Sequence, residues 1–120
     1  MEISIKNITS GTAIEYVPLE GDFISKAIGL MFRRKGKIMM KFSFESRQGI
    51  WMMFMRFPID IAFIDSDKCI VDIKHDVKPI SMNPKSWKIY TPCRKCKYVL
   101  EVEAGHLNEK KFKVGDTLEF

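Results

Sequence analysis

Hydrophobic and polar side chains alternate along much of this chain. Between residues 38 and 44 the even positions are apolar, whereas Lys41 and Ser43 are polar. The segment 69–77 shows the same alternation, because its odd positions hold four apolar residues and His75 while three of its even positions are charged. A period of two residues is typical of a strand with one buried face. We therefore expect both segments to be half-buried strands.

Turn-forming residues separate further segments with a β-type pattern. The sequence Asp-Ser-Asp-Lys at 65–68 is typical of a turn, so the apolar run at 59–64 is expected to pair with 69–77 as a hairpin. Gly11 and the Gly-Asp pair at 115–116 mark other turns. The remaining predicted strands are 3–6, 12–17, 50–55, 98–103 and 117–120.

One segment has helical spacing instead. Its apolar residues at positions 23, 24, 27, 28 and 31 fall on one face of a helix, with Asp22 placed to cap its start and Gly29 near its end. A single helical turn is also expected around 107–111. By contrast, the segment 78–97 contains three prolines, which disfavour strand pairing. A loop of this length in a small domain is often functional.

The number and length of these elements predict the fold class. About eight short strands and one longer helix predict a mainly β fold in a single domain spanning residues 1–120, either a small closed β-barrel or a two-sheet sandwich with the helix covering one end or face. No apolar run approaches the roughly 20 residues of a membrane helix, and the first residues lack a signal-peptide pattern. We therefore expect a cytoplasmic protein without membrane contacts.

The net charge of +5 is unevenly distributed along the chain. The segments 23–44 and 77–100 each contain six basic residues and no acidic residue, whereas the rest of the chain is acidic. If these two basic segments meet in space, they form a positive patch suited to an acidic partner.

The second basic segment also places aromatic rings among its cations. This combination is typical of single-stranded nucleic-acid binding, although it also fits a solvated lysine-rich loop whose tryptophan packs on the barrel. The residues concerned are Lys85, Trp87, Lys88, Arg94 and Lys95.

Cys93 and Cys96 form the sharpest local motif, a C-x-x-C turn flanked by basic residues. Such a turn can bind zinc or close as a redox disulfide, with His75 as a further candidate ligand. A structural zinc site needs four ligands, and the motif precedes a predicted strand, whereas a thioredoxin-like site opens a helix. The alternative is a pair of loop cysteines without a cofactor, and we expect none apart from this possible zinc. His75 can equally be a core histidine bonded to a backbone carbonyl.

Two charged residues, Arg56 and Asp60, interrupt the otherwise apolar stretch 50–64. A charge in such a run must be paired or lie at the mouth of a pocket. One interpretation is an internal Arg–Asp pair that fixes the chain at Pro58. The other is an apolar cleft, lined by Trp51 and its neighbours, in which Arg56 holds an anionic ligand. No hydrolase triad motif, phosphate loop or dinucleotide fingerprint occurs, so enzymatic activity is not expected.

Several motifs occur in an order that resembles the prokaryotic domain-of-unknown-function family DUF192. They are Gly-Leu-Met-Phe-Arg at 29–33, Trp-Met at 51–52, Pro-Ile-Asp-Ile-Ala-Phe-Ile-Asp at 58–65, Tyr-Val-Leu-Glu at 98–101, Ala-Gly at 104–105 and Val-Gly-Asp at 114–116. The resemblance covers nearly the whole chain and implies a mostly β domain with a short helix, but no activity. Many bacterial members have Lys-Asn-Thr where this chain has Met-Phe-Met at 53–55, and the C-x-x-C motif is not part of the general family pattern.

Together, the pattern and the resemblance lead to one main hypothesis. The protein is expected to be a non-enzymatic module that binds an unidentified small ligand or a partner protein. The candidate binding residues are Arg33, Trp51, Arg56, Asp60 and Glu101, of which Arg33 and Glu101 rest on the resemblance.

Overall fold

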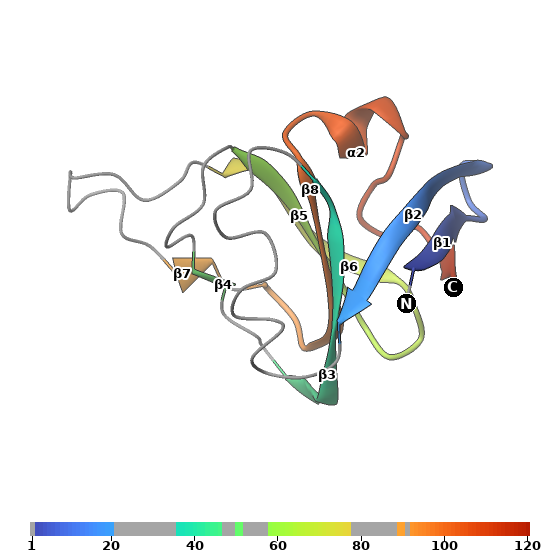
Figure 1. Cartoon of the computed structure of the whole chain (residues 1–120). Coiled ribbons are helices and arrows are strands. Elements are labelled where there is room, and N and C mark those ends of the chain that lie inside the picture. The colour runs from blue at the N-terminus through green and yellow to red at the C-terminus, as the bar shows by residue number, and fades with distance from the viewer. Residues whose placement is uncertain (1, 21–35, 47–49, 52–57, 78–88, 91) are drawn as a thin grey trace.

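The computed structural model describes residues 2–20, 36–46, 50–51, 58–77, 89–90 and 92–120 (Figure 1). Their strands and helix are, in chain order, β1 (Glu2–Asn7), β2 (Thr12–Glu20), β3 (Ile38–Ser46), β4 (Ile50–Trp51), β5 (Ile59–Ile64), β6 (Ile70–Val77), β7 (Ile89–Tyr90), β8 (Cys96–Glu103), α2 (His106–Glu109) and β9 (Leu118–Glu119). The predicted mainly β class is therefore confirmed.

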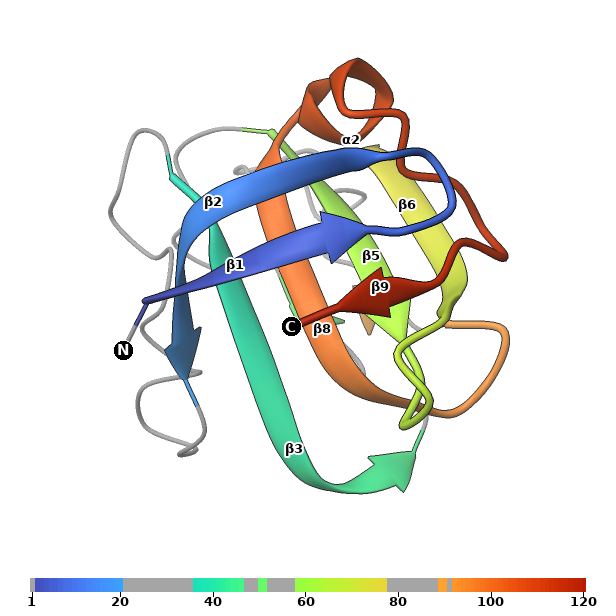
Figure 2. The same ribbon diagram turned by 90° about the vertical axis from the view of Figure 1, so that its right-hand side faces the viewer.

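Most strands belong to one curled sheet. Its order is β6-β5-β8-β3-β2-β1-β9, while β4 and β7 form a separate two-stranded sheet. Figure 2 shows β1, β2 and β9 lying across β3, β8, β5 and β6. A bridge between Cys69 and Thr117 joins the start of β6 to the start of β9, so the two edges of the sheet come together. This curl favours the barrel-like alternative over the two-sheet sandwich.

The predicted strands agree well with the observed ones, and β5 and β6 form the expected antiparallel hairpin. Two differences concern the less regular segments. β7 lies in the proline-containing stretch where no strand was predicted, and the expected turn at 107–111 is α2, one residue earlier. The helix expected at 23–31 lies outside the described residues.

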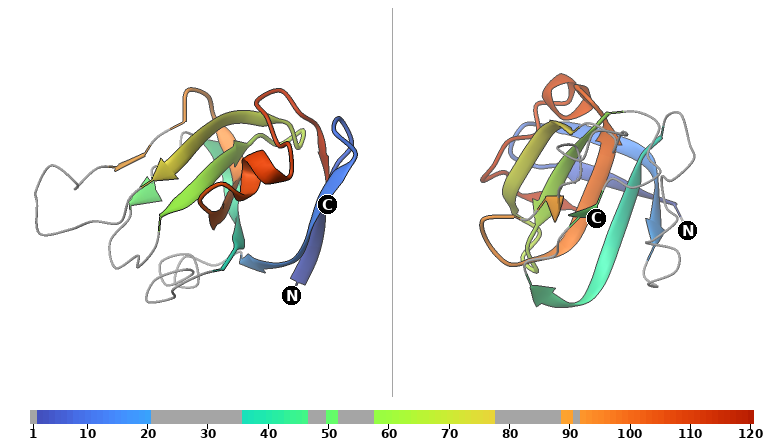
Figure 3. Two further views of the ribbon diagram at one scale, coloured as in Figure 1. Left: turned by 90° about the horizontal axis from the view of Figure 1, so that it is seen from above. Right: turned by 90° about the vertical axis from the view of Figure 1, so that its left-hand side faces the viewer.

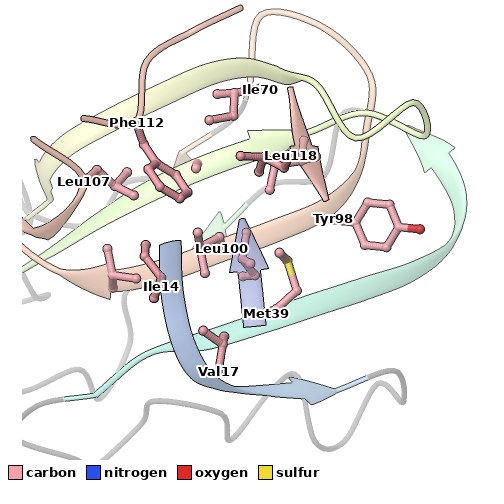
Figure 4. Close-up of a cluster of buried hydrophobic side chains, with 13 residues drawn as sticks. Ile14, Val17, Met39, Ile70, Tyr98, Leu100, Leu107, Phe112 and Leu118 are labelled. Carbon is pink, nitrogen blue, oxygen red and sulfur yellow. The ribbon is translucent and has the colours of Figure 1, made fainter. Parts of the chain in front are cut away.

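The interior of the curled sheet holds the larger hydrophobic cluster (Figure 4). Strands β1 and β2 contribute Ile5, Ile14 and Val17, and the central strand β8 contributes Leu100. Leu107 of α2 and Phe112, which follows it, close one end of this interior. Burial of large apolar side chains between the two halves of the sheet is the main stabilising term for such a fold.

The opposite side of the central strands carries a second hydrophobic cluster, which we call the second face. It comprises Ile38, Met40, Ile59, Ile61, Phe63, Val77, Cys96 and Val99. Because β5 contributes to both clusters, all six of its residues are buried. This explains why the segment 59–64 has no clear alternation in the sequence.

The alternation predicted for 69–77 is wrong in detail. β5 and β6 pair Phe63 with Asp72 and then Ile64 with Ile70, so the register skips Val71. Ile73 consequently packs against the interior cluster, while Val71 packs against the second face. A bulge of this kind reverses the faces of the residues beyond it. His75 lies on the same side as Ile73, beside Asp60, but 46% of its side chain is exposed near the end of the edge strand β6, so it is not a core histidine.

Candidate functional site

Glu101 is the buried carboxyl of β8, and its place in the ladders puts it on the second face. The ladders pair Glu101 with Ile38 of β3 on one side and with Ile61 of β5 on the other. Directly opposed residues lie close enough for their side chains to touch. The residue is only 7% exposed, although its carboxyl is flanked by these two apolar side chains.

Burial of the carboxyl has a clear electrostatic consequence. Desolvation raises the pKa of Glu101 from its ordinary value of 4.5 to about 7. A lysine that lies across the sheet is Lys74 of β6. It lies two strands away from Glu101, because Ile61 of β5 pairs with Glu101 on one side and with Lys74 on the other. The Lys74 ammonium lies 3.2 Å from a carboxylate oxygen of Asp72 and is thus already paired. Within the described ranges, no hydrogen-bond donor contacts the Glu101 carboxyl.

Asp60 lies on the opposite side of the sheet, at one end of the interior, opposite Val102 of β8. Its side chain is 1% exposed and both carboxylate oxygens accept backbone hydrogen bonds. The N–H of Asp76 donates to Oδ1 and the N–H of Gly105 donates to Oδ2, each at 2.9 Å. His75 adds Nδ1 at 3.8 Å from Oδ1. Asp60 therefore ties β5 to the end of β6 and to the loop before α2.

Of the five predicted binding residues, the two with described side chains do not lie together. Asp60 and Glu101 lie on opposite faces of the sheet. Trp51 belongs to β4, and Figures 1 and 3 place β4 and β7 on the side of the main sheet that faces away from β1 and β2, which is the side of the second face. Arg33 and Arg56 lie outside the described residues. The described part of the predicted site thus divides into an aspartate with two backbone donors and a glutamate between two isoleucines on the ladders.

The C-x-x-C motif places its two sulfurs in different environments. Cys93 is exposed, whereas Cys96 is buried in the second-face cluster. The backbone N–H of Cys93 donates to Oδ2 of Asp72 at 2.9 Å, and its Sγ donates to the carbonyl of Val71 at 3.4 Å. These contacts fix the exposed thiol against β6.

His75 does not join the cysteines. It lies beside Asp60, near the end of β8, whereas Cys96 begins this strand. Six residues of extended chain separate these positions by roughly 20 Å. In the described part of the chain, no three His, Cys, Asp or Glu side chains gather as a potential metal site.

The described parts of the two basic segments are neighbours. β3 pairs with β8, so that Lys41 lies opposite Tyr98. Lys41, Arg94 and Lys95 are exposed. The predicted nucleic-acid residues Lys85, Trp87 and Lys88 lie outside the described residues.

The sequence was compared with protein families of known sequence, and one family matches. Residues 6–120 match the model of the DUF192 family, described as uncharacterised. The chain belongs to this family. Similar proteins are the UPF0127 protein of Pyrococcus furiosus, with 33% identity over 95% of both chains, and the one from Pyrococcus abyssi, with 35% identity over 87% of this chain and 85% of the relative.

Two solved structures share the fold of this DUF192 protein. One, from Sinorhizobium meliloti 1021, is described as a putative transcription regulator and has a TM-score of 0.86 at 28% identity, covering 99% of this chain and 93% of the other. The second, a protein of unknown function from Novosphingobium aromaticivorans, has a TM-score of 0.83 at 22% identity, covering 98% and 83%. Among the described residues, no helix has the length and apolar character needed to cross a membrane.

One surface feature of this DUF192 protein was not predicted. Tyr16 of β2 has a φ of 57° and a side chain that is 72% exposed. The pairing of β1 with β2 shifts register here, because Ile3 faces Val17 whereas Ile5 faces Ile14. Glu15 and Tyr16 are therefore the bulged residues opposite Ser4. In the sequence, strict alternation from Ile14 would have placed the Tyr16 ring in the interior.

Proposed function

We propose that this DUF192 protein is a binding module for a small, largely apolar molecule that carries a protonated amine. The second face would contact the apolar body of this ligand, and the Glu101 carboxylate would bind its ammonium group. The observation that carries the proposal is the burial of one carboxyl of β8 beside isoleucines of the two flanking strands, β3 and β5.

The chemistry of the carboxyl favours an amine over other polar groups. An ionised carboxylate in an apolar environment is unfavourable unless a cation or several donors approach it. Since Lys74 is engaged by Asp72 at 3.2 Å, a cation from outside the described residues is needed. An ammonium ligand both provides the charge and donates hydrogen bonds to the carboxylate.

Apolar recognition and a single orienting charge are the usual components of small-molecule sites. The residues beside Glu101 on the ladders, Ile38 and Ile61, are 4% and 0% exposed. They make the surroundings of the carboxyl apolar. This arrangement supports selectivity for an amine with a hydrocarbon body over a fully polar amine.

The test is a thermal-unfolding titration at pH 8 with hexylamine, hexanol and hexanoate as probes. We expect hexylamine to raise the unfolding temperature of the wild type, and hexanol and hexanoate to do so much less. Glu101→Gln should abolish the preference for the amine, because it keeps the shape of the side chain without its charge. The matched control is Glu103→Gln, an exposed carboxyl on the same strand.

Two results of this titration would contradict the proposed role of Glu101. Equal effects of the three probes on the wild type, or an amine preference that survives Glu101→Gln, would show that Glu101 is not the recognition group.

A second candidate function is single-stranded nucleic-acid binding. The pairing of β3 with β8, which joins the described parts of the two acid-free segments, favours it. The description of the related Sinorhizobium meliloti structure as a putative transcription regulator is compatible with it. Fluorescence anisotropy with labelled single-stranded DNA should then show binding that weakens steeply with salt and is reduced by Arg94→Glu and Lys95→Glu. No binding at low salt would exclude this function.

A further inference from the structure

Tyr16 sits on the outside of β2 in a conformation that tyrosine rarely adopts. A φ of 57° falls in the left-handed region, which is unfavourable for a residue with a Cβ atom. Glycine would adopt this conformation without strain. The bulge turns the aromatic ring outward, where 72% of it meets solvent. Large exposed aromatic rings are typical of the centres of protein–protein interfaces.

The ring separates two hollows of opposite charge. On the β1 side, a hollow of about 280 Å³ is lined by Glu2, Ile3, Ser4, Glu15 and Tyr16. On the other side, a hollow of about 440 Å³ is lined by four residues of β2, Glu15 among them, and by Lys37, His106 and Lys110, so that its two lysines outnumber its one acidic side chain. We call these the acidic hollow and the basic hollow.

The topology explains why the hollows lie on opposite sides of Tyr16. In the sheet, β2 lies between β1 and β3. β2 pairs with β3 only at Leu19 and Glu20, so its earlier part is not hydrogen-bonded to β3. The basic hollow opens there, between β2 and α2. The hydroxyl of Thr12 in β2 donates a hydrogen bond to the carbonyl of Lys110, which follows α2, so this bond links the two sides of the basic hollow.

We infer that this surface is a two-fold interface between two copies of the chain. A two-fold axis that runs along β2 through Tyr16 exchanges the β1 side with the β3 side. The acidic hollow of one copy then faces the basic hollow of the other, twice, while the two Tyr16 rings meet at the axis. A symmetric dimer requires such a self-complementary patch. Charge complementarity about one exposed ring therefore points to a second copy as the occupant.

Analytical ultracentrifugation of the full chain over a range of concentrations tests the inference. We expect the wild type to form a dimer whose dissociation constant rises with salt. Tyr16→Gly should raise this constant by about tenfold or more. Its unfolding midpoint should remain close to that of the wild type, because the substitution removes the ring but relieves the backbone.

Charge reversal gives a sharper test. Glu2→Lys places like charges in both contacts of the dimer, and so does Lys110→Glu. Each variant alone should be monomeric, whereas an equimolar mixture should form a heterodimer, because every contact in it pairs opposite charges. Lys113→Glu reverses an exposed charge outside the surface and should leave the dimer unchanged.

Two results would overturn the inference. A wild type that remains monomeric at all concentrations would exclude the second copy as the occupant. A dimer that persists in Tyr16→Gly and in both charge reversals would use another surface.

Discussion

Replacing Glu101 by glutamine should stabilise the protein at alkaline pH but not at acidic pH. Burial raises the pKa of the Glu101 carboxyl from 4.5 in an ordinary environment to about 7 in the folded chain. Between these values the folded state keeps a proton that the unfolded state has lost. The unfolded state therefore binds fewer protons, and the free energy of unfolding falls as the pH rises.

The magnitude follows from the difference between the two pKa values. Each pKa unit corresponds to about 1.4 kcal/mol. Glu101 should thus lower the free energy of unfolding by about 3 kcal/mol above pH 7, relative to its contribution below pH 4.5. The glutamine side chain does not titrate in this pH range, so the variant lacks this pH-dependent term. The advantage of Glu101→Gln over the wild type should accordingly grow between pH 4.5 and 7 and then remain constant.

Urea unfolding of both proteins at half-unit steps from pH 4.5 to 8.5 measures this difference directly. Glu103→Gln, which changes an exposed carboxyl of the same strand, should give a nearly constant difference from the wild type. Carbon-13 NMR of the glutamate carboxyl groups should show one group titrating near pH 7. A flat difference curve for Glu101→Gln would refute the reasoning, because it would mean that the buried carboxyl ionises as easily as an exposed one.

Three other predictions concern the remaining described features. Asp60→Ala should lower the free energy of unfolding by about 3 kcal/mol in denaturant titrations, because it removes the charged acceptor of two part-buried hydrogen bonds, from the N–H groups of Asp76 and Gly105; a loss below about 1 kcal/mol would argue against this role. Cys93 should react with iodoacetamide in the native protein, whereas Cys96 should react only after unfolding, as peptide mapping can show; equal rates would contradict their different burial. Tyr16→Gly should change the unfolding free energy by less than about 1 kcal/mol, because relief of the positive φ offsets the greater flexibility of glycine; a larger loss would show that the ring stabilises the fold.

Local patterns predicted the strands well because burial follows the two-residue period wherever strands pair regularly. The position of β3 follows from this period, and the hairpin of β5 and β6 follows from the turn residues at 65–68 between two apolar segments. The period fails where a bulge intervenes. At Val71 and at Tyr16 an extra residue in one strand reverses the faces, and no local signal in the sequence marks either point. Tyr16 was consequently overlooked.

The candidate site was predicted only in part, for a different reason. Asp60 stood out as a charge in an apolar run, but its partners are backbone N–H groups of Asp76 and Gly105, which no side-chain pattern can indicate. Glu101 was selected through the family resemblance. Its position between Ile38 and Ile61 depends on the pairing of three strands that are distant in sequence. The different surroundings of Asp60 and Glu101 therefore depend on which strands pair in the sheet, and a local sequence pattern does not contain this information.

The two buried carboxylates illustrate how function can be distinguished from structure in a protein of this kind. Asp60 is satisfied by two backbone donors at 2.9 Å, so its removal should destabilise the fold. Glu101 has no such donors within the described part of the chain, and its burial raises its pKa, so its replacement should stabilise the fold above neutral pH. A residue that weakens the structure it occupies needs another reason to be there. The opposite signs of the two effects therefore separate a carboxylate that holds the chain together from one that is available to a ligand.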